Sequence, residues 1–322
     1  MEAGARIYIA GHRGLAGSAL VRALERAGCG NLVLRNHAEL ELADAVAVRE
    51  FFRRERPEHV FVAAAKVGGI LANDRYPADF IAENLAIELN VIREAARTGV
   101  KRLLFLGSSC IYPRDCPQPM KEEQLLAGPL EPTNRPYAIA KIAGVELCWS
   151  YNRQHGAKFL AAMPTNLYGP GDNYHPEDSH VLAALLRKIH EAKQRGEPRV
   201  ALWGSGRPRR EFLHADDMAE ACVFLMRLPQ GEFDRLVAPA AAPLVNVGAG
   251  KDIAIAELAA LVAEVVGWRG AFAYDGTKPD GTPRKLLDVS RLEALGWRPR
   301  IGLREGIARA YQDFLRQHAA AA

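Results

Sequence analysis

The chain has 322 residues, of which 49% are hydrophobic and 25% are charged, so it carries enough apolar material for a sizeable core. The formal net charge of +4 is small for this length and favours neither a nucleic-acid-binding surface nor a membrane-binding surface. At about 150 residues per domain, the length is typical of two domains.

The five cysteines are odd in number, and no two of them have the C-x-x-C spacing of a zinc or redox site. No apolar run typical of a signal peptide precedes the first strand, and no stretch approaches the roughly 20 apolar residues of a membrane span. We therefore expect free thiols, no metal site and a cytoplasmic protein.

The first half of the chain alternates short apolar runs with helical patterns. Strands are expected at residues 7–10, 32–34, 60–64, 103–106 and 159–163. Helices are expected at residues 15–27, 45–56, 80–98 and 137–154. Because the strands are apolar throughout, the pattern predicts an α/β fold with a Rossmann-type doubly wound parallel sheet.

The second half is less regular. Helices are expected at residues 180–195, 216–228, 255–266 and 304–316, and a strand at residues 200–203. The Ala/Pro-rich stretch at residues 229–243 is expected to be a surface loop. These elements predict a smaller C-terminal α/β domain.

The first predicted strand runs directly into a glycine pattern, G-x-x-G-x-x-G, that opens the first helix. Its residues are Gly11, His12, Arg13, Gly14, Leu15, Ala16 and Gly17. Glycines here allow a tight turn and let the backbone approach a pyrophosphate at the helix N-terminus. A glycine-rich turn without a ligand is the alternative, but the position between strand and helix favours a dinucleotide site.

The residues after the second predicted strand bear on the choice between NAD and NADP. Arg35 and His37 lie there, no acidic residue precedes Glu39, and Arg13 lies in the glycine loop. Cations at these places suit a 2′-phosphate, although Arg35 and His37 are also compatible with a plain surface role. Asp44, before the next helix, fits either an adenine contact or a helix N-cap.

Tyr137 and Lys141 stand at positions i and i+4 of a predicted helix and so share a face. The ammonium is expected to stabilise the phenolate and to lower the pKa of Tyr137 toward the working pH. Tyr137 then becomes a proton donor for a keto group that accepts hydride. The Y-x-x-x-K pattern is common, and its place after four strands of a dinucleotide fold favours catalysis.

Polar residues also follow the fourth predicted strand, at an edge where ligands bind in open α/β sheets. Ser108 and Ser109 are candidates to hydrogen-bond the substrate oxygen beside Tyr137. Cys110 is a candidate to take a proton from carbon, and His180 is a candidate to return one. A buried inert cysteine and a surface histidine are equally compatible with the sequence.

Segments along essentially the whole chain resemble the GDP-L-fucose synthase family of extended short-chain dehydrogenases. The blocks GSSCIYP and KPDGTPRK are specific to this family. The matching stretches are IYIAGHRGLAGSA at 7–19, AAAKVGGILAN at 63–73, YPADFI at 76–81, LLFLGSSCIYP at 103–113, EPTNRPYAIAKIAG at 131–144, MPTNLYGP at 163–170, HPEDSHV at 175–181, WGSG at 203–206, REFLHADDMA at 210–219 and KPDGTPRKLLDV at 278–289.

The resemblance implies an NADPH-dependent enzyme that acts on GDP-4-keto-6-deoxy-D-mannose. Inversion of sugar carbons 3 and 5 precedes reduction of the 4-keto group, and the product is GDP-L-fucose. The resemblance makes Cys110 the epimerising base and His180 the acid, and it assigns Ser108, Tyr137 and Lys141 to the reduction.

The resemblance also implies binding residues. Cofactor contacts are Gly11, His12, Arg13, Gly14, Leu15, Ala16, Gly17, His37, Ala38, Glu39, Leu40, Glu41, Leu42, Leu106, Gly107, Ser108, Ser109, Lys141, Pro164, Thr165, Asn166, Leu167 and His180. Substrate contacts are Lys188, Trp203, Arg210 and Asp280. The expected domains are an NADP-binding domain at 1–168, to which 210–240 returns, and a GDP-sugar domain at 169–322. A homodimer is expected through a four-helix bundle of helices 80–98 and 137–154.

The chain departs from the family pattern at two cations. His37 stands where members of the family carry an arginine on the 2′-phosphate, and Lys188 also replaces an arginine. Two rival functions remain: a redox-neutral nucleotide-sugar 4-epimerase or 4,6-dehydratase, and a non-enzymatic NADP(H)-sensing protein. Ser109-Cys110 occupies the place where dehydratases carry an acidic residue, and the retained Tyr137 and Lys141 argue against a sensor.

Overall fold

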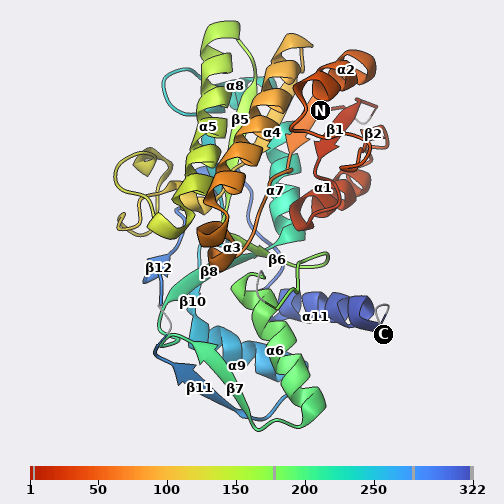
Figure 1. The fold of residues 1–322 in the computed structure, drawn as a ribbon. Coiled ribbons are helices and arrows are strands. Elements are labelled where there is room, and N and C mark those ends of the chain that lie inside the picture. The colour runs from red at the N-terminus through yellow and green to blue at the C-terminus, as the bar shows by residue number, and fades with distance from the viewer. Residues whose placement is uncertain (3, 177–178, 278–279, 320–322) are drawn as a thin grey trace.

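The computed structural model describes residues 1–2, 4–176, 179–277 and 280–319. A six-stranded parallel sheet forms its centre, with the strand order β2-β1-β3-β4-β5-β9 (Figure 1). These strands are β1 Ile7–Ala10, β2 Leu32–Val33, β3 His59–Val62, β4 Arg102–Leu106, β5 Phe159–Pro164 and β9 Leu244–Val247. The chain moves from β1 out to β2 and then back across β1 to β3, which confirms the doubly wound Rossmann-type sheet.

Helices cover both faces of this sheet, and the alternation of side chains along β1 shows the two cores. Ile7 and Ile9 pack in one core and Tyr8 packs in the other, because successive side chains of a strand point to opposite faces. The helices on the side of Ile7 are α1 Leu15–Arg26 and α7 Ala215–Arg227. The helices on the side of Tyr8 are α2 Ala45–Glu55, α4 Pro77–Arg97 and α5 Arg135–His155.

The second half of the chain lies mainly beyond the carboxyl ends of the central strands (Figure 1). Its main sheet is built on β8, which pairs with three short strands. The central strand is β8 Arg209–His214, and its three partners are β6 Asn166–Tyr168, β10 Asp252–Ala254 and β12 Arg284–Lys285. Strands β7 Arg199–Trp203 and β11 Ala271–Asp275 form a separate pair. A third apolar core joins helices α6 Val181–Arg195, α9 Ile255–Val266 and α11 Leu303–Ala319.

The expected surface loop at residues 229–243 was wrong in part, because α8 Gln230–Leu236 lies within it. Phe233 of this helix is fully buried in the core beneath α7, and its ring lies 4.2 Å from the Arg102 guanidinium. Burial of one aromatic side chain holds a helix in a segment whose composition is typical of a loop.

The remaining helices are short. They are α3 Ile70–Arg75 and α10 Ser290–Ala294, with 3₁₀ turns at Ser109–Ile111, Glu122–Gln124 and Pro132–Asn134. Among the described residues, no helix is both long and apolar enough to cross a membrane. The domain boundaries stay a prediction, while the return of α7 and β9 to the first sheet is a feature of the structure.

Candidate functional site

A cavity of about 1130 Å³ opens over the carboxyl ends of the central strands. Gly11 follows β1, Arg35 follows β2 and Ala63 follows β3, and all three line the cavity. Leu106 and Pro164, the last residues of β4 and β5, line it as well. The carboxyl edge of an open α/β sheet is where ligands bind, so the fold itself places the site here.

The cavity collects nearly all the residues that the resemblance assigns to the cofactor. Every predicted cofactor contact except Gly17 and Glu39 lines it. Gly17 is buried under the glycine loop, where a Cβ atom would overlap the Gly11 carbonyl. Glu39 is turned to the backbone instead, and its Oε2 accepts from the Asn36 amide at 2.8 Å.

The glycine loop fits a pyrophosphate. Gly11 has a positive φ of +83°, and a Cβ atom there would lie 2.7 Å from the Ala64 backbone. No side chain caps α1 at Gly14, and the first turn of the helix holds no acidic residue. The helix N-terminus is therefore open toward an anionic group. Nδ1 of His12, which lines the cavity, is buried without a hydrogen-bond partner among the described residues.

Three cationic side chains, Arg13, Arg35 and His37, line the cavity near the end of β2, and two of them already have carboxylate partners. Arg35 Nη2 lies 2.8 Å from Glu55 Oε1, and His37 Nδ1 lies 3.0 Å from Glu41 Oε2. The described residues give Arg13 neither a hydrogen bond nor an ion pair, so it is the cation most available to a 2′-phosphate there. Asp44 caps α2, and its Oδ1 accepts from two backbone amides at 2.8 and 3.1 Å.

Tyr137 lines the same cavity from the start of α5, as the Y-x-x-x-K pattern predicts. The expected lowering of its pKa is wrong in direction. Burial, with smaller contributions from the Cys110 and Glu88 charges, raises the pKa of Tyr137 well above its usual value, and only a hydrogen bond with Ser108 opposes this. The site therefore favours the protonated tyrosine.

The Lys141 ammonium contacts Glu88 and the backbone of β4. Its Nζ lies 3.0 Å from Glu88 Oε1 and donates to the Leu106 carbonyl oxygen at 3.2 Å. The side chains of Lys141 and Glu88 are 2% and 0% exposed. The Lys141 Nζ also lies 5.8 Å from the centre of the Tyr137 ring. A buried ion pair thus stands behind the tyrosine.

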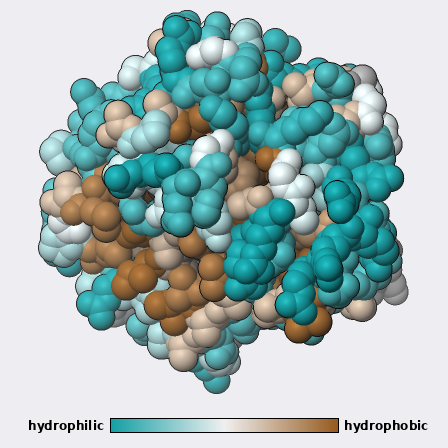
Figure 2. All heavy atoms as spheres, turned by 90° about the horizontal axis from the view of Figure 1, so that it is seen from above, coloured by the Kyte–Doolittle hydropathy of each residue, from teal (hydrophilic) through white to brown (hydrophobic). Residues whose placement is uncertain are grey.

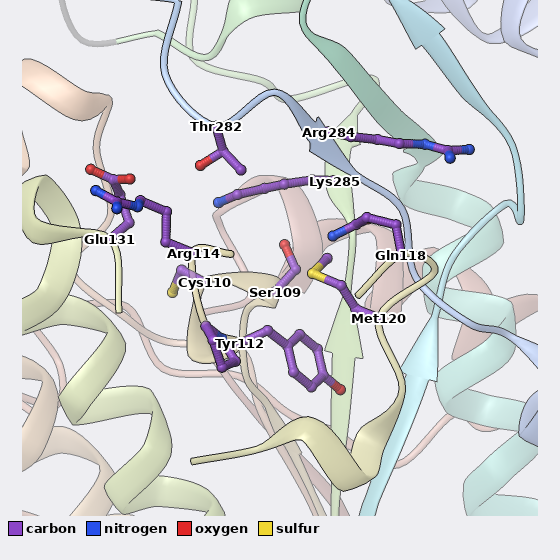
Figure 3. Close-up of a pocket in the computed structure, with 11 residues that line it drawn as sticks. Ser109, Cys110, Tyr112, Arg114, Gln118, Met120, Glu131, Thr282, Arg284 and Lys285 are labelled. Carbon is purple, nitrogen blue, oxygen red and sulfur yellow. The ribbon is translucent and has the colours of Figure 1, made fainter. Parts of the chain in front are cut away.

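Cys110 lies in the 3₁₀ turn after β4 and is 7% exposed. It lines a small pocket next to the large cavity, and Ser109 lines both (Figure 3). Burial raises the pKa of the Cys110 thiol, and a hydrogen bond with Ser108 and the charge of Lys285 lower it. Figure 3 shows the Lys285 ammonium pointing into the pocket that Cys110 lines.

Ser108 links the two candidate proton-transfer groups. Its Oγ accepts from the Cys110 backbone amide at 3.5 Å, and hydrogen bonding to this side chain lowers the pKa of both Tyr137 and Cys110 against their burial. His180 stands at the N-terminus of α6 and lines the large cavity with Tyr137. The His180 side chain is exposed. The protein atoms around the ring partly desolvate it, and this lowers the pKa of His180.

The four predicted substrate contacts lie outside the large cavity, in the second half of the chain. Lys188 Nζ lies 5.1 Å from the centre of the Trp203 ring. Asp280 Oδ2 accepts from the Ser205 hydroxyl at 2.7 Å. Arg210 is the register partner of Lys285 across β8 and β12, so the two cations stand side by side in the sheet.

Sequence reasoning missed two residues that shape the site, Glu88 and Lys285, and left the role of Asn84 open. Glu88 appeared only as one position in a helical pattern, and Lys285 only as part of a matched block. Asn84, on α4, accepts from the Lys66 amide at 2.9 Å and donates to the Lys66 carbonyl at 3.0 Å, which fixes a cavity-lining loop. A buried polar residue on an apolar helix face was the available signal for Glu88 and Asn84.

No group of three or more metal-ligating side chains occurs in the part of the chain that the structure describes. Two matched sequence stretches include residues outside the described part, namely 177–178 and 278–279.

Comparison with known proteins places this site in a family. Residues 7–237 match the model of the NAD dependent epimerase/dehydratase family. The chain is 56% identical over 315 residues to "Putative GDP-L-fucose synthase 2" of Arabidopsis thaliana, covering 98% of the chain and 93% of that protein. It is 56% identical over 310 residues to the GDP-L-fucose synthase of Escherichia coli (strain K12), covering 96% of each.

Solved structures agree with the sequence relatives. A GDP-L-fucose synthetase from Naegleria fowleri bound to NADP matches with a TM-score of 0.87 and 26% identity, over 99% of this chain and 96% of that one. A GDP-D-glycero-L-gluco-heptose synthase from Campylobacter jejuni, solved in the presence of NADPH, matches with a TM-score of 0.90 and 37% identity, over 98% of this chain and 99% of that one. The chain therefore belongs to the NAD dependent epimerase/dehydratase family and, within it, to the GDP-L-fucose synthases.

Proposed function

We propose that this enzyme converts GDP-4-keto-6-deoxy-D-mannose to GDP-L-fucose, by epimerisation at sugar carbons 3 and 5 and NADPH-dependent reduction at carbon 4. The observation that carries the proposal is that Tyr137, Ser108 and Cys110 lie together at the carboxyl end of β4. Tyr137 and Ser108 line the large cavity, and Cys110, in the 3₁₀ turn after Ser108, lines the adjoining pocket. Tyr137 supplies a proton to oxygen and Cys110 removes a proton from carbon. The 56% identity to two fucose synthases supports this substrate.

The epimerisation is assigned to Cys110 and His180. The 4-keto group acidifies the C–H bonds at carbons 3 and 5, so a thiolate can remove each proton and leave an enolate. His180 then returns a proton to the opposite face of the carbon, which inverts the centre. The charge of Lys285 supports the thiolate form of Cys110 against its burial.

The reduction is assigned to Tyr137, with Ser108 and Lys141 in support. When bound, NADPH supplies the hydride that carbon 4 receives. Tyr137 donates its proton to the 4-keto oxygen as negative charge develops there, and Ser108 orients that oxygen by hydrogen bonding. The raised pKa of Tyr137 keeps this proton in place before the reaction.

The cofactor site is assigned to the large cavity. The open N-terminus of α1 and the close approach at Gly11 suit the pyrophosphate, and Arg13, Arg35 and His37 lie near the expected 2′-phosphate. Because Arg35 and His37 are paired with carboxylates, we expect Arg13 to carry most of the preference for NADP over NAD.

The GDP part of the substrate is assigned to the second half of the chain. Lys188 and Arg210 are cations suited to the diphosphate, and Trp203, which is 53% exposed, offers a ring for stacking on guanine. Burial lowers the pKa of both Lys188 and Arg210, and a bound diphosphate would stabilise their charged forms. Residues 1–168, with 210–240 returning to them, then act as the cofactor domain, and the rest of 169–322 acts as the substrate domain.

We also propose a cytoplasmic homodimer in which α4 and α5 of two subunits form a four-helix bundle. Leu89 on α4 and Ile139 on α5 are each 41% exposed. Apolar residues gather on one side of the molecule in Figure 2, which is the side of α4 and α5 in Figure 1. Large exposed apolar patches mark interaction sites. Leu89→Arg should yield a monomer in light scattering, and an unchanged dimer would remove this interface.

The test of the proposed function is the absorbance of NADPH with purified protein and GDP-4-keto-6-deoxy-D-mannose. The expected result is loss of one NADPH for each GDP-L-fucose formed. A changed sugar without loss of NADPH would indicate a redox-neutral epimerase or dehydratase. Tight NADPH binding without turnover of this sugar or of GDP-heptoses would indicate a sensor.

A further inference from the structure

The ion pair between Glu88 and Lys141 joins the two long helices behind the site. Glu88 lies on α4 and Lys141 on α5, and their charged atoms are 3.0 Å apart with almost no exposure. Both Glu88 oxygens are buried, and Lys141 is the partner that the described residues give the carboxylate, acting on it through its charge and a hydrogen bond. Gly144 on α5 leaves room for it, because a Cβ there would lie 2.9 Å from Glu88 Oε2.

A buried carboxylate at this point is not needed for packing. Burying an ion pair costs desolvation that an apolar pair of similar size avoids, and apolar replacements are often neutral or stabilising. The surrounding side chains are otherwise apolar or weakly acidic, with the Phe105 ring 4.8 Å from Lys141 Nζ. The pair is therefore better explained by what its charges do to the site.

The titratable groups that face the pair are weak acids. Tyr137 and Cys148 face it from α5, and the Glu88 charge raises the pKa of both. Cys110 faces it from the turn after β4, and the Lys141 charge lowers the pKa of that thiol. Burial raises the pKa of Glu88 itself, and the charge of Lys141 opposes this. A lysine alone beside Tyr137 would lower the pKa of the tyrosine, and the Glu88 charge opposes that lowering.

Resting on the proposed reduction, we propose that Glu88 is a positioning residue that fixes the Lys141 ammonium against the end of β4 and cancels part of its charge, so that Tyr137 keeps its proton until the 4-keto oxygen takes it. In that step the O–H bond of Tyr137 breaks as hydride adds to carbon 4 and the new alcohol O–H forms. The phenolate that remains is reprotonated from solvent.

The test is the pH profile of kcat/KM for NADPH consumption in Glu88→Gln. The neutral amide leaves the Lys141 charge uncancelled, so the pKa of Tyr137 falls and the loss of activity at high pH begins about one pH unit lower. Above that limb the rate is about tenfold below wild type. Glu94→Gln is the matched control. Glu94 is a 3%-exposed carboxylate on the same helix, and its ion-pair partners among the described residues are Arg93 and Arg97.

Glu88→Asp adds a graded variant that retains the charge. Its carboxylate is withdrawn by one methylene group, so the alkaline limb should move in the same direction as in Glu88→Gln but by less. An alkaline limb at the wild-type pH in both variants would overturn the proposal. If Glu88→Gln does not fold, as judged by circular dichroism and NADPH binding, an unshifted limb in Glu88→Asp overturns it alone.

A readout without substrate separates this proposal from the proposed function. The tyrosinate absorbance of each protein, minus that of its Tyr137→Phe counterpart, follows the titration of Tyr137 alone. Glu88→Gln should move this titration to lower pH, whichever sugar the enzyme uses. A wild-type protein that consumes no NADPH with the proposed sugar would reject the function, whereas an unmoved Tyr137 titration would reject the role of Glu88.

Discussion

Two weak acids meet at the end of β4, and each faces a lysine, but the two lysines differ in their partners. Lys141, near Tyr137, is paired with the buried carboxylate of Glu88 at 3.0 Å. Lys285, which faces Cys110, makes no ion pair within 4 Å with any carboxylate that the structure describes. Instead it stands beside a second cation, Arg210, in the sheet.

The difference matches the opposite tasks of the two acids. A proton donor must hold its proton. Burial raises the pKa of Tyr137, and the charges of Cys110 and Glu88 add to that rise. A base must lose its proton. Burial raises the pKa of Cys110, and the Ser108 hydrogen bond and the Lys285 charge oppose that rise. Burial raises the pKa of both groups, and the nearby charges of Glu88 and Lys285 then act on the two in opposite directions. The predictions below separate the two pairs, in order of decreasing effect.

The largest expected effect is that of Tyr137→Phe on reduction. Loss of a general acid typically costs 10²- to 10⁴-fold, and we expect about 10³-fold loss of NADPH-dependent reduction. Deuterium exchange from solvent into the sugar should continue, because Cys110 and His180 are intact. NADPH binding, followed by fluorescence, controls for the fold. Reduction at the wild-type rate would remove Tyr137 from the mechanism.

Cys110→Ser should affect the opposite half of the reaction. A serine hydroxyl is a much weaker acid than a thiol, so the base form is lost and exchange at carbons 3 and 5 should fall by about 10²-fold. Mass spectrometry of the recovered GDP-sugar after incubation in D₂O gives the rate. Exchange at the wild-type rate would show that another group removes these protons.

Lys285→Met should give a smaller effect on the same half reaction. Without the ammonium, the pKa of Cys110 rises, so less thiolate is present at a given pH and the acidic limb of exchange moves about one unit higher. Below that limb, exchange should be about tenfold slower. Lys251→Met, at an exposed lysine of the same half of the chain, is the control. An unmoved limb would leave Cys110 without electrostatic support from Lys285.

Much of the cofactor half could be predicted from the sequence, because its information is local. The glycine loop, the apolar strands and the i, i+4 spacing of Tyr137 and Lys141 all lie within single elements. Short strands of the second half were missed because they depend on partners far along the chain: β8 alone pairs with segments at residues 166–168, 252–254 and 284–285.

The electrostatics of the site could not be predicted for the same reason. The i, i+4 spacing indicates that Lys141 lies near Tyr137, but not that Glu88, 53 positions before Lys141, meets it across a helix pair. The direction of the Tyr137 pKa was therefore predicted wrongly. Asp44, for which the sequence left two interpretations, is the N-cap of α2 in the structure, and its contact with adenine stays a prediction.

His37→Arg should have the smallest effect, confined to the cofactor. An arginine offers a phosphate a permanent charge and a fork of donors, which a histidine lacks. We expect NADPH to bind about fivefold more tightly and NADH to bind unchanged, measured by fluorescence titration. Equal tightening of both would place residue 37 away from the 2′-phosphate.

The most direct test of the account is the pH dependence of the two half reactions in the wild-type protein. Deuterium exchange, measured without NADPH, should rise with pH, because it needs the Cys110 thiolate. Reduction of a sugar that is already epimerised should fall at high pH, because it needs the Tyr137 proton. Exchange that rises with pH, together with reduction that falls with pH, would support the account that Cys110 acts as the base and Tyr137 as the acid. A single limb of the same direction in both profiles would contradict it.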